Sequence, residues 1–331
     1  MMKPKISIIT PVWNGMPYLM DCINSVLSQM FQDWEMLISD DGSTDGSRAI
    51  LDEITDPRIK IFNQDKNLGI FGNLNFLMDK VQGRIVQVLC QDDLLLQDGL
   101  IDIIQSWKES DPSTSFIRHN WYDYHNTAKK NKYYSSKVLK CHQEARNTHF
   151  VFYIFGNPSG NLSNVSFNPV FFKEGVRFRE DLPYAGDYEY WGRLGSLGPW
   201  QLNTKQVSFV RSHEGQASNY LNFKGELVAQ QKSIKEFFFH SIESSYPKFL
   251  LKLRGSVNYF RFIVLALKSH NSNFRKEVYK NIGSPAHLHP ILTLLLFILS
   301  FGGKLSYQLS VKMLIAKNQS AFNESRSDHG K

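Results

Sequence analysis

Apolar and polar positions alternate with two different periods along the first hundred residues. Residues 6–10 are a short run rich in β-branched side chains that Pro11 closes, which predicts a buried strand. In the stretch 19–27 apolar residues recur every three or four positions, which predicts a helix ending near Gln29. The alternation continues with strands expected at 34–38, 58–62 and 84–90 and helices at 47–54, 73–81 and 100–110. This order predicts an α/β fold with a doubly wound, mostly parallel sheet flanked by helices.

Three of the predicted strands end in short segments that carry proline or aspartate. Pro11 ends the first strand, Asp41 follows the second, and Asp93 follows the strand expected at 84–90. In open α/β sheets, ligands bind in the crevice beyond the carboxyl ends of the strands. We therefore expect these three segments to border one binding site.

The pattern is weaker between residues 60 and 200. Residues 63–72 are expected as a long polar loop. The stretch 123–147 is polar and has no clear period, so an acceptor-side loop and a disordered connection are both open. An apolar strand is expected at 165–172 and a helix at 188–197, with Asp187 at the N-terminal end of that helix.

The last third of the chain has a different pattern, with long helices and few turns expected beyond about residue 222. The most apolar run, Ile291–Phe301, spans only 11 residues, whereas a bilayer crossing needs about 20. Lysines then alternate with leucines in a basic amphipathic pattern. We expect two domains, a catalytic domain over 1–221 and a basic helical extension over 222–331.

Charge separates the same two regions. Residues 1–231 hold 23 Lys+Arg and 26 Asp+Glu, a net charge of −3, whereas residues 232–331 hold 15 and 5, a net charge of +10. A basic region of this kind attracts nucleic acid or acidic lipid headgroups, or only favours solubility. No nucleic-acid recognition module is apparent, so nucleic acid is not expected as a partner. Peripheral contact with the inner membrane surface and helical packing on the catalytic domain stay open as alternatives.

Cysteine content and the N-terminus bear on the compartment. Three widely spaced cysteines favour a reducing compartment, and Lys3 and Lys5 lead directly into the first strand without an apolar leader. We therefore expect a cytoplasmic active site, either free or at the cytoplasmic face of the membrane. The chain has no Gly-x-Gly-x-x-Gly, P-loop or nucleophile-elbow motif, which argues against a dehydrogenase, a kinase or a hydrolase.

Several motifs stand in one order that resembles the family 2 glycosyltransferases, which have the GT-A fold. They are IITPVWN at 8–14, SVLSQ at 25–29, ISDDGSTD at 38–45, NLG at 67–69 and QDD at 91–93, and the resemblance covers roughly residues 5–215. It implies an inverting enzyme that moves a sugar from a nucleotide-diphosphate donor, with a UDP-sugar expected, to a glycan or lipid-linked acceptor. Bacterial surface polysaccharide, such as O-antigen or capsule, is the implied product.

The resemblance also implies a divalent metal, Mn²⁺ or Mg²⁺, that neutralises the leaving diphosphate. Asp93 stands where the family has its metal-coordinating carboxylate, and Asp92 beside it would face the donor sugar or ribose. His213, after the last expected strand, is a second candidate ligand. Without the resemblance, an acidic pair after a strand is equally a helix cap or a plain loop, and His213 is a surface-loop residue.

The donor pocket follows from the same comparison of motifs. Asp41 would accept a hydrogen bond from the uracil N3–H, and Trp13 stands where the family more often has tyrosine, which leaves stacking intact but weakens the choice of uracil over thymine. Loop asparagines often satisfy their own backbone instead of a ligand. The residues expected to contact the donor are Pro11, Val12, Trp13, Asn14, Asp41, Asn67, Asn73, Asp92, Arg193 and Arg211.

Asp187 is the expected general base. It precedes a helix carrying Trp191 and Arg193, as in the family, but Gly186 stands where the family often has glutamate. One base without a carboxylate nucleophile implies a single displacement with inversion. Glu189 is the competing carboxylate, and it is expected to point elsewhere because residues two apart on a helix do not share a face.

Two other functions are weighed against this one. The first is a non-catalytic nucleotide-sugar-binding scaffold, against which the presence of Asp93, Asp187 and Arg193 together argues. The second is transfer onto polyprenyl phosphate, which needs no base of this kind. The sequence does not indicate the sugar, the linkage, the acceptor or the oligomeric state.

Overall fold

The computed structural model describes residues 3–127, 130–135, 141–213 and 226–242, and the single residues 248, 251, 252, 255 and 276. The chain forms two compact units. The first consists of Met1–Ala145 and Ser159–Gln216, and the second of Arg146–Pro158 and Ala217–Lys331. The expected domain boundary at 221/222 lies outside the described residues.

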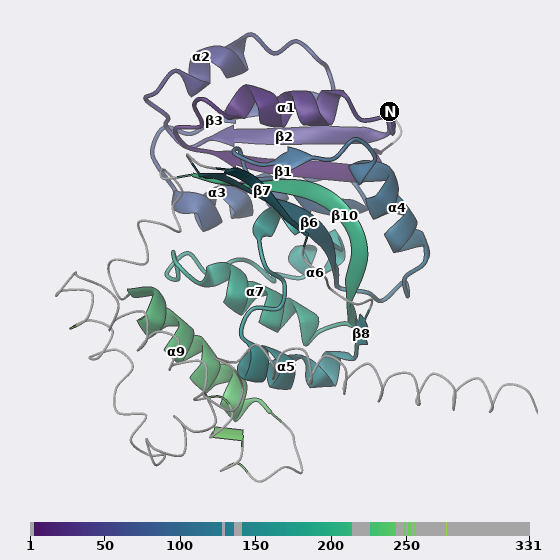
Figure 1. Ribbon diagram of the computed structural model, residues 1–331, viewed down its shortest axis with the longest axis vertical. Helices are drawn as coiled ribbons and strands as arrows, with labels where there is room; N and C mark the ends of the chain where they lie inside the picture. Colours follow the sequence, from purple (N-terminus) through teal and green to yellow (C-terminus); the bar gives the residue numbers. More distant parts are fainter. Residues whose placement is uncertain are drawn as a thin grey trace, which may run out of the picture. The chain divides into compact units, whose positions relative to one another are not determined.

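A ten-stranded sheet forms the centre of the first unit, in the order β3-β2-β1-β4-β9-β6-β10-β5, with β7 paired to β6 and β8 to β10 (Figure 1). The four strands β3, β2, β1 and β4 are parallel neighbours, whereas β9, β5, β7 and β8 pair antiparallel. The strands are β1 Ile6–Val12, β2 Trp34–Asp40, β3 Ile59–Asn63, β4 Ile85–Val88, β5 Leu94–Leu95, β6 Phe116–Thr127, β7 Lys130–Ser135, β8 Cys141–Gln143, β9 Val165–Phe167 and β10 Trp200–Ser212.

Register places the ends of the central strands side by side. Val12 pairs with Asp40 across β1 and β2, and Ile9 pairs with Val88 across β1 and β4. β1 and β2 are buried along their whole length, so most of their residues are apolar, and their polar residues, such as Glu35 and Asp40, are enclosed as well. The loops that follow β1, β2 and β4 therefore begin at one edge of the sheet, as the strand pattern predicts.

Helices cover both faces of this sheet. α1 Leu19–Leu27, α2 Ser47–Asp52 and α4 Gly99–Lys108 contribute to one apolar cluster with β1 and β2. α3 Gly69–Met78 packs on β1 and β2, and Figure 1 shows it on the other side of the sheet from α1 and α2. The predicted α/β architecture, a sheet flanked by helices, is confirmed.

Three expected elements differ from the structure. The loop expected over 63–72 ends early, because α3 begins at Gly69 rather than at residue 73. The strand expected over 165–172 ends at Phe167, and α6 Pro169–Lys173 follows, with the Asn168 side chain accepting the Val170 N–H at its start. An asparagine N-cap followed by proline is a helix-start signal that outweighs the apolar composition of this segment.

The irregular connection expected over 123–147 is also wrong for its described part. β6 continues to Thr127, β7 pairs antiparallel with it, β8 joins the far side of β10, and the 3₁₀ turn Ala145–Asn147 follows. Such strands are specified by backbone pairing with a distant strand, so the local pattern of polar residues does not reveal them. The remaining helix of this unit, α7 Gly186–Gly195, lies within two residues of its expected position.

The second unit contains α5 Thr148–Phe155 and α9 Glu226–His240. Aromatic side chains join the two helices. The rings of Phe152 and Phe238 lie 5.9 Å apart and those of Tyr153 and Phe239 5.4 Å apart. Within the residues that the structure describes, the helices are all too short or too polar to span a bilayer. The apolar run Ile291–Phe301 and the basic pattern after it lie outside those residues.

Candidate active site

The loop after β1 is fixed to the loop after β4 by a reciprocal pair of hydrogen bonds. The Trp13 N–H donates to Gln91 Oε1 at 2.8 Å, and Gln91 Nε2 donates to the Trp13 carbonyl at 2.9 Å. The Trp13 indole remains 56% exposed, an unusual state for a residue of this size beside a buried strand. Its backbone is therefore fixed while its ring is accessible to a ligand.

The loops after β1 and β2 are joined in a similar way. The Asn14 N–H donates to Ser43 Oγ at 2.8 Å, and Asn14 Oδ1 accepts the Thr44 N–H at 2.8 Å. Asn14 has a φ of 51°, a left-handed conformation that asparagine tolerates better than most residues. The described contacts of Asn14 thus shape the loop, and its contact with the donor stays a prediction.

Asp41 is held at the start of α3. Its carboxylate is buried and accepts the N–H groups of Leu68 at 2.7 Å and Gly69 at 3.0 Å. Burial raises the pKa of the Asp41 carboxyl, and these two hydrogen bonds act in the opposite direction. A carboxylate from the loop after β2 therefore caps a helix that follows β3, which explains why α3 begins before its own sequence predicts.

The two asparagines expected in the donor pocket bond to the backbone. Asn67 Oδ1 accepts the Gly69 N–H at 2.9 Å. Asn73 is almost fully buried, and its Nδ2 donates to the Ser39 carbonyl at 2.9 Å. Both contacts agree with the alternative that these asparagines bond to the backbone instead of a ligand. Their contact with a donor stays a prediction.

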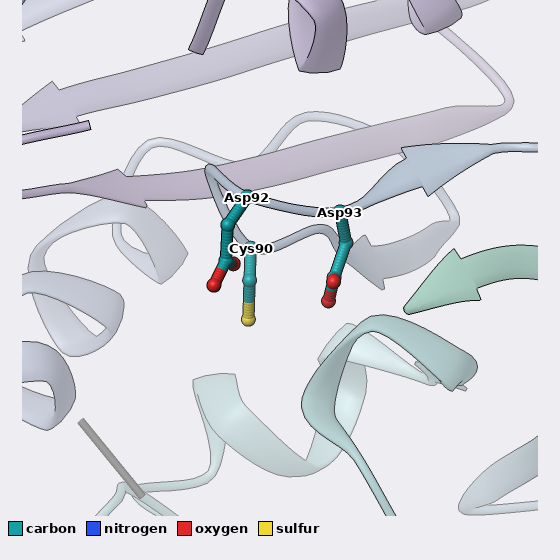
Figure 2. A group of neighbouring side chains, drawn as sticks. All are labelled: Cys90, Asp92 and Asp93. Atoms are coloured by element: carbon teal, nitrogen blue, oxygen red, sulfur yellow. The ribbon is translucent and has the colours of Figure 1, made fainter. Parts of the chain in front are cut away.

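Cys90, Asp92 and Asp93 form a cluster in the turn after β4, and Figure 2 shows their side chains extending from the same side of that turn. One ligand atom from each lies within 4.8 Å of the other two. We call these three residues the β4-turn cluster. The sequence predicts the two aspartates here but assigns no role to the thiol.

Asp93 is the buried member of the β4-turn cluster, with 1% of its surface exposed. Ser163 Oγ donates to Asp93 Oδ2 at 2.5 Å, and the Arg211 N–H donates to Oδ1 at 3.0 Å. Burial first, and then the neighbouring Asp92 carboxylate, raise the pKa of Asp93 well above its usual value. The structure thus places this carboxylate in the least hydrated part of the site.

Ser163 is a site residue that the sequence analysis does not identify. Its hydroxyl accepts the Cys90 N–H at 2.9 Å while it donates to Asp93. It lies in the 3₁₀ turn Leu162–Asn164, where Asn161 Oδ1 accepts the Ser163 N–H at 2.9 Å. The Asn161 cap is a recognisable local signal, but nothing near Ser163 in the sequence indicates that it reaches β4.

Asp92 contacts His213, the residue that follows β10. Asp92 Oδ2 lies 3.1 Å from His213 Nε2, and each side chain is about one-fifth exposed. The His213 ring packs against the Tyr18 ring with centroids 4.5 Å apart. His213 therefore does lie beside the acidic pair, as expected, although its contact is with Asp92 rather than Asp93.

Arg211 is held by the same helix that supports His213. Its guanidinium lies 4.9 Å from the Tyr18 ring centroid and donates to Asp21 Oδ2 at 2.7 Å. Tyr18 and Asp21 belong to the start of α1, where the sequence suggests only a helix beginning. The end of β10 is thus attached to α1 through one aromatic ring and one ion pair.

The donor atoms of this site suit a divalent cation. Carboxylates are common ligands of Mg²⁺ and Mn²⁺, and imidazole suits Mn²⁺ and Zn²⁺. The acidic pair lies in the turn after β4, and His213 at the end of β10 reaches Asp92. Asp92 is the more accessible of the two carboxylates and Asp93 the more buried. The residues present therefore fit the predicted metal, and Asp93 as its direct ligand stays a prediction.

Asp187 lies in the first turn of α7, at the position expected from the sequence, and is partly buried. Gly186 before it packs tightly on α3, because a Cβ atom there would lie 2.6 Å from the Phe71 ring. The Phe71 ring is in turn stacked on Phe178 with centroids 5.2 Å apart. An aromatic ring occupies the space that any larger residue at 186 would need, which accounts for glycine at this place.

Arg193 and Glu189 form an ion pair on α7. Arg193 Nε and Nη2 donate to the two carboxylate oxygens of Glu189 at 2.8 and 3.0 Å, and Glu189 is 5% exposed. Glu189 is thus engaged away from Asp187, as expected for the competing carboxylate. The described contacts of Arg193 are structural, and its contact with the donor stays a prediction.

Comparison with known proteins gives the class of this fold. The crystal structure of Staphylococcus aureus TarS residues 1–349 in complex with UDP-GlcNAc resembles it with a TM-score of 0.64, at 15% identity, over 85% of this chain and 80% of that one. The first unit therefore has the fold of the GT-A glycosyltransferases, as predicted.

The sequence comparison points to one family. The profile described as glycosyl transferase family 2 matches residues 7–159, just under half of the chain, and this part of the chain is similar to that family.

Two curated relatives are each similar over about a third of the chain. TuaG of Bacillus subtilis, named as a teichuronic acid biosynthesis glycosyltransferase, is 38% identical over 120 residues, which is 36% of this chain and 48% of TuaG. The GalNAc(5)-diNAcBac-PP-undecaprenol beta-1,3-glucosyltransferase of Campylobacter jejuni is 37% identical over 109 residues, or 32% of this chain and 35% of that protein. The matched part is thus about half of the first relative and about a third of the second.

Proposed function

We propose that this protein is an inverting glycosyltransferase that moves a sugar from a UDP-sugar to a glycan or lipid-linked acceptor in bacterial surface polysaccharide synthesis. The observation that carries the proposal is the β4-turn cluster, which lies at the carboxyl end of a central parallel strand, in a turn that Gln91 joins to the loop after β1. This is the edge of an α/β sheet at which nucleotides bind.

The donor nucleotide would lie on the loops after β1 and β2. The exposed Trp13 ring offers a stacking surface for the base, and Pro11 and Val12 end the strand beneath it. Asp41 keeps the capacity to accept the uracil N3–H, because each carboxylate oxygen has two lone pairs and its known hydrogen bonds use one each. Fixed loops of this kind lower the ordering cost of binding.

Asp93 and His213 would hold the divalent cation, with Asp92 next to them as a further carboxylate and Arg211 beside the site. When bound, this cation neutralises the charge that grows on the diphosphate as the bond to the sugar breaks. Arg211 adds a fixed positive charge near the same place, held by Asp21 and the Tyr18 ring. We propose Mn²⁺ or Mg²⁺ as the physiological ion.

Asp187 would act as the general base for the acceptor. Its carboxylate takes the proton of the acceptor hydroxyl while that oxygen forms a bond to the anomeric carbon. The bond from this carbon to the β-phosphate oxygen breaks at the same time, and the nucleoside diphosphate leaves with both electrons. Because attack and departure occur on opposite faces, the configuration at the carbon inverts.

The acceptor class is inferred from the relatives. One is named for teichuronic acid biosynthesis and another for a substrate linked to undecaprenol through a diphosphate. A lipid-linked acceptor would agree with an active site at the cytoplasmic face of a membrane, the location that we propose.

A panel of nucleotide sugars tests the donor and the metal together. We expect one UDP-sugar to raise the melting temperature in the presence of Mn²⁺, since a ligand at a hundredfold excess over its Kd contributes about 2.7 kcal/mol. Asp92→Asn should abolish the metal-dependent part of this shift, whereas Asp98→Asn, an exposed residue at the start of α4, should keep it.

Two outcomes would contradict the proposal. Transfer that continues undiminished in excess EDTA would remove the metal from it. A donor that binds, but whose sugar is transferred neither to water nor to a lipid-linked oligosaccharide, would favour the non-catalytic scaffold instead.

A further inference from the structure

We propose that Cys90 is a thiolate ligand of the cation held by Asp92, Asp93 and His213, so that of the two ions proposed above this site favours Mn²⁺ over Mg²⁺ and also binds the softer probe ions Zn²⁺ and Co²⁺. The inference rests on the proposed function, because it concerns the ligand set of the same metal site. It adds a sulfur donor that the acidic motif by itself does not contain.

Geometry is the first support. The Cys90 sulfur and one carboxylate oxygen each from Asp92 and Asp93 lie within 4.8 Å of one another. A cation bonded to sulfur at ~2.3 Å and to oxygen at ~2.1 Å keeps those atoms within about 4.4 Å. The three side chains extend from one side of the turn (Figure 2), so small rotations would bring them onto one ion.

The backbone around Cys90 is fixed, which makes this arrangement specific. Its N–H donates to Ser163 Oγ at 2.9 Å, and its carbonyl accepts the Asp93 N–H at 3.0 Å and the Cys22 thiol at 3.5 Å. The Ser163 hydroxyl that holds Cys90 also holds Asp93. The backbone of Cys90 and the carboxylate of Asp93 are therefore held by one side chain.

The mixture of donors is the second support. Cys90 offers sulfur, His213 nitrogen, and the two aspartates oxygen. Mg²⁺ prefers an octahedral set of oxygens, whereas sulfur and imidazole nitrogen select softer, tetrahedral ions. Cys90 is also the least buried of the three cysteines, because Cys22 and Cys141 are both fully enclosed.

The alternative is that Cys90 is an ordinary small apolar residue next to the site. Under that alternative, serine at position 90 would leave the choice of metal unchanged. Cobalt(II) distinguishes the two, because thiolate bound to Co²⁺ gives a sulfur-to-metal charge-transfer band in the near ultraviolet and carboxylate does not.

The test uses the full chain with UDP and Co²⁺ under anaerobic conditions. We expect the charge-transfer band in the wild type and in Cys141→Ser, a control on β8, and its loss in Cys90→Ser and Cys90→Ala. A band that survives in both Cys90 variants, or that is lost only in Cys22→Ala, overturns the proposal.

Thermal shifts with Zn²⁺, Co²⁺ and Mg²⁺ give a second readout. The affinity for Zn²⁺ relative to Mg²⁺ should fall at least about tenfold in Cys90→Ser, since even loss of an outer-shell partner costs that much. An unchanged ratio overturns the thiolate ligand alone and leaves the proposed function standing. A wild type that binds none of these ions with UDP contradicts both this inference and the metal of the proposed function.

Discussion

The turn that carries Asp92 and Asp93 and the helix start that carries Asp187 are held in different ways. Hydrogen bonds fix the turn, with Ser163 and the Arg211 N–H on Asp93 and Gln91 joined to the loop after β1. Packing limits the helix start, where Gly186 leaves no space between α7 and the Phe71 ring. A hydrogen-bonded turn needs particular polar residues, so it can be recognised in the sequence as a motif. A glycine required by packing instead interrupts a motif, as Gly186 does.

Replacing the proposed general base, Asp187, tests the role of the helix start most directly. Asp187→Asn should reduce kcat by about 10²- to 10⁴-fold, the usual contribution of general-base catalysis, and leave the Kd for the donor unchanged. Rates of product formation and donor titrations check this. Asp181→Asn, which alters an exposed aspartate paired with Arg179, is the matched control and should keep the full rate. A variant at 187 that retains most of its rate removes the base from this residue.

Adding one methyl group at position 186 tests the packing between α7 and the Phe71 ring. Gly186→Ala would place Cβ 2.6 Å from the Phe71 ring, and overpacking of this kind costs about 3 kcal/mol at the upper end of its range. Urea unfolding followed by tryptophan fluorescence measures it, because all six tryptophans lie in the first unit. Phe71→Leu in the same chain should recover part of the loss, and a double variant no more stable than Gly186→Ala would refute the contact.

A buried histidine makes the part of the sheet next to α7 sensitive to acid. Burial lowers the pKa of His119 to about 3, and its Nε2 lies 2.8 Å from Ser166 Oγ. The unfolded chain gains a proton near pH 6.5 that the folded chain cannot bind, so stability is lost as the pH falls from about 6.5 towards 3. Relative to His119→Gln, the wild type should lose about 2 kcal/mol between pH 7.5 and pH 5.

Urea unfolding of both proteins at the two pH values measures this difference. The comparison at pH 7.5 gives the cost of the substitution itself, since the histidine is then neutral in both states. If the difference between the two proteins does not change with pH, His119 takes up a proton in the folded state and is less enclosed than the structure indicates.

The smallest effect is expected at the ion pair between α1 and β10. Asp21 is 61% exposed, so Asp21→Asn should lower the free energy of unfolding by less than about 1 kcal/mol, and less again at high salt. Unfolding at two salt concentrations measures this. A loss as large as that of Gly186→Ala would mean that hydrogen bonds and ion pairs, rather than packing, dominate the stability of this unit.

Much of the region at the carboxyl ends of the central strands could be predicted from the sequence. β1, β2 and β4 have short apolar runs with clear ends, and parallel pairing brings those ends together without further information. Asp41, Asp92 and Asp93 follow these ends directly, so their positions depend on only a few local residues. The same holds for Asp187, which begins a helix with a clear pattern.

The remainder depends on contacts between distant segments. Asp41 caps α3 from 27 residues away, Ser163 reaches Asp93 across 70, and Arg211 reaches Asp21 across 190. No local pattern encodes such partners, which is why the start of α3, the role of Ser163 and the support of His213 by Tyr18 were not predicted. Asn67 and Asn73 show the opposite case. The sequence assigns them to the donor pocket, yet their described hydrogen bonds are to backbone groups.

The single hydroxyl of Ser163 has one further consequence. A backbone N–H can only donate, so the Cys90 N–H takes a lone pair of the Ser163 oxygen, and the hydroxyl proton points to Asp93 Oδ2. This direction holds while the Asp93 carboxylate is ionised, because an ionised carboxylate can only accept a hydrogen bond. Asp93 is oriented as an acceptor before any ligand arrives, so the entropy of preorganising it is lost during folding and not during binding.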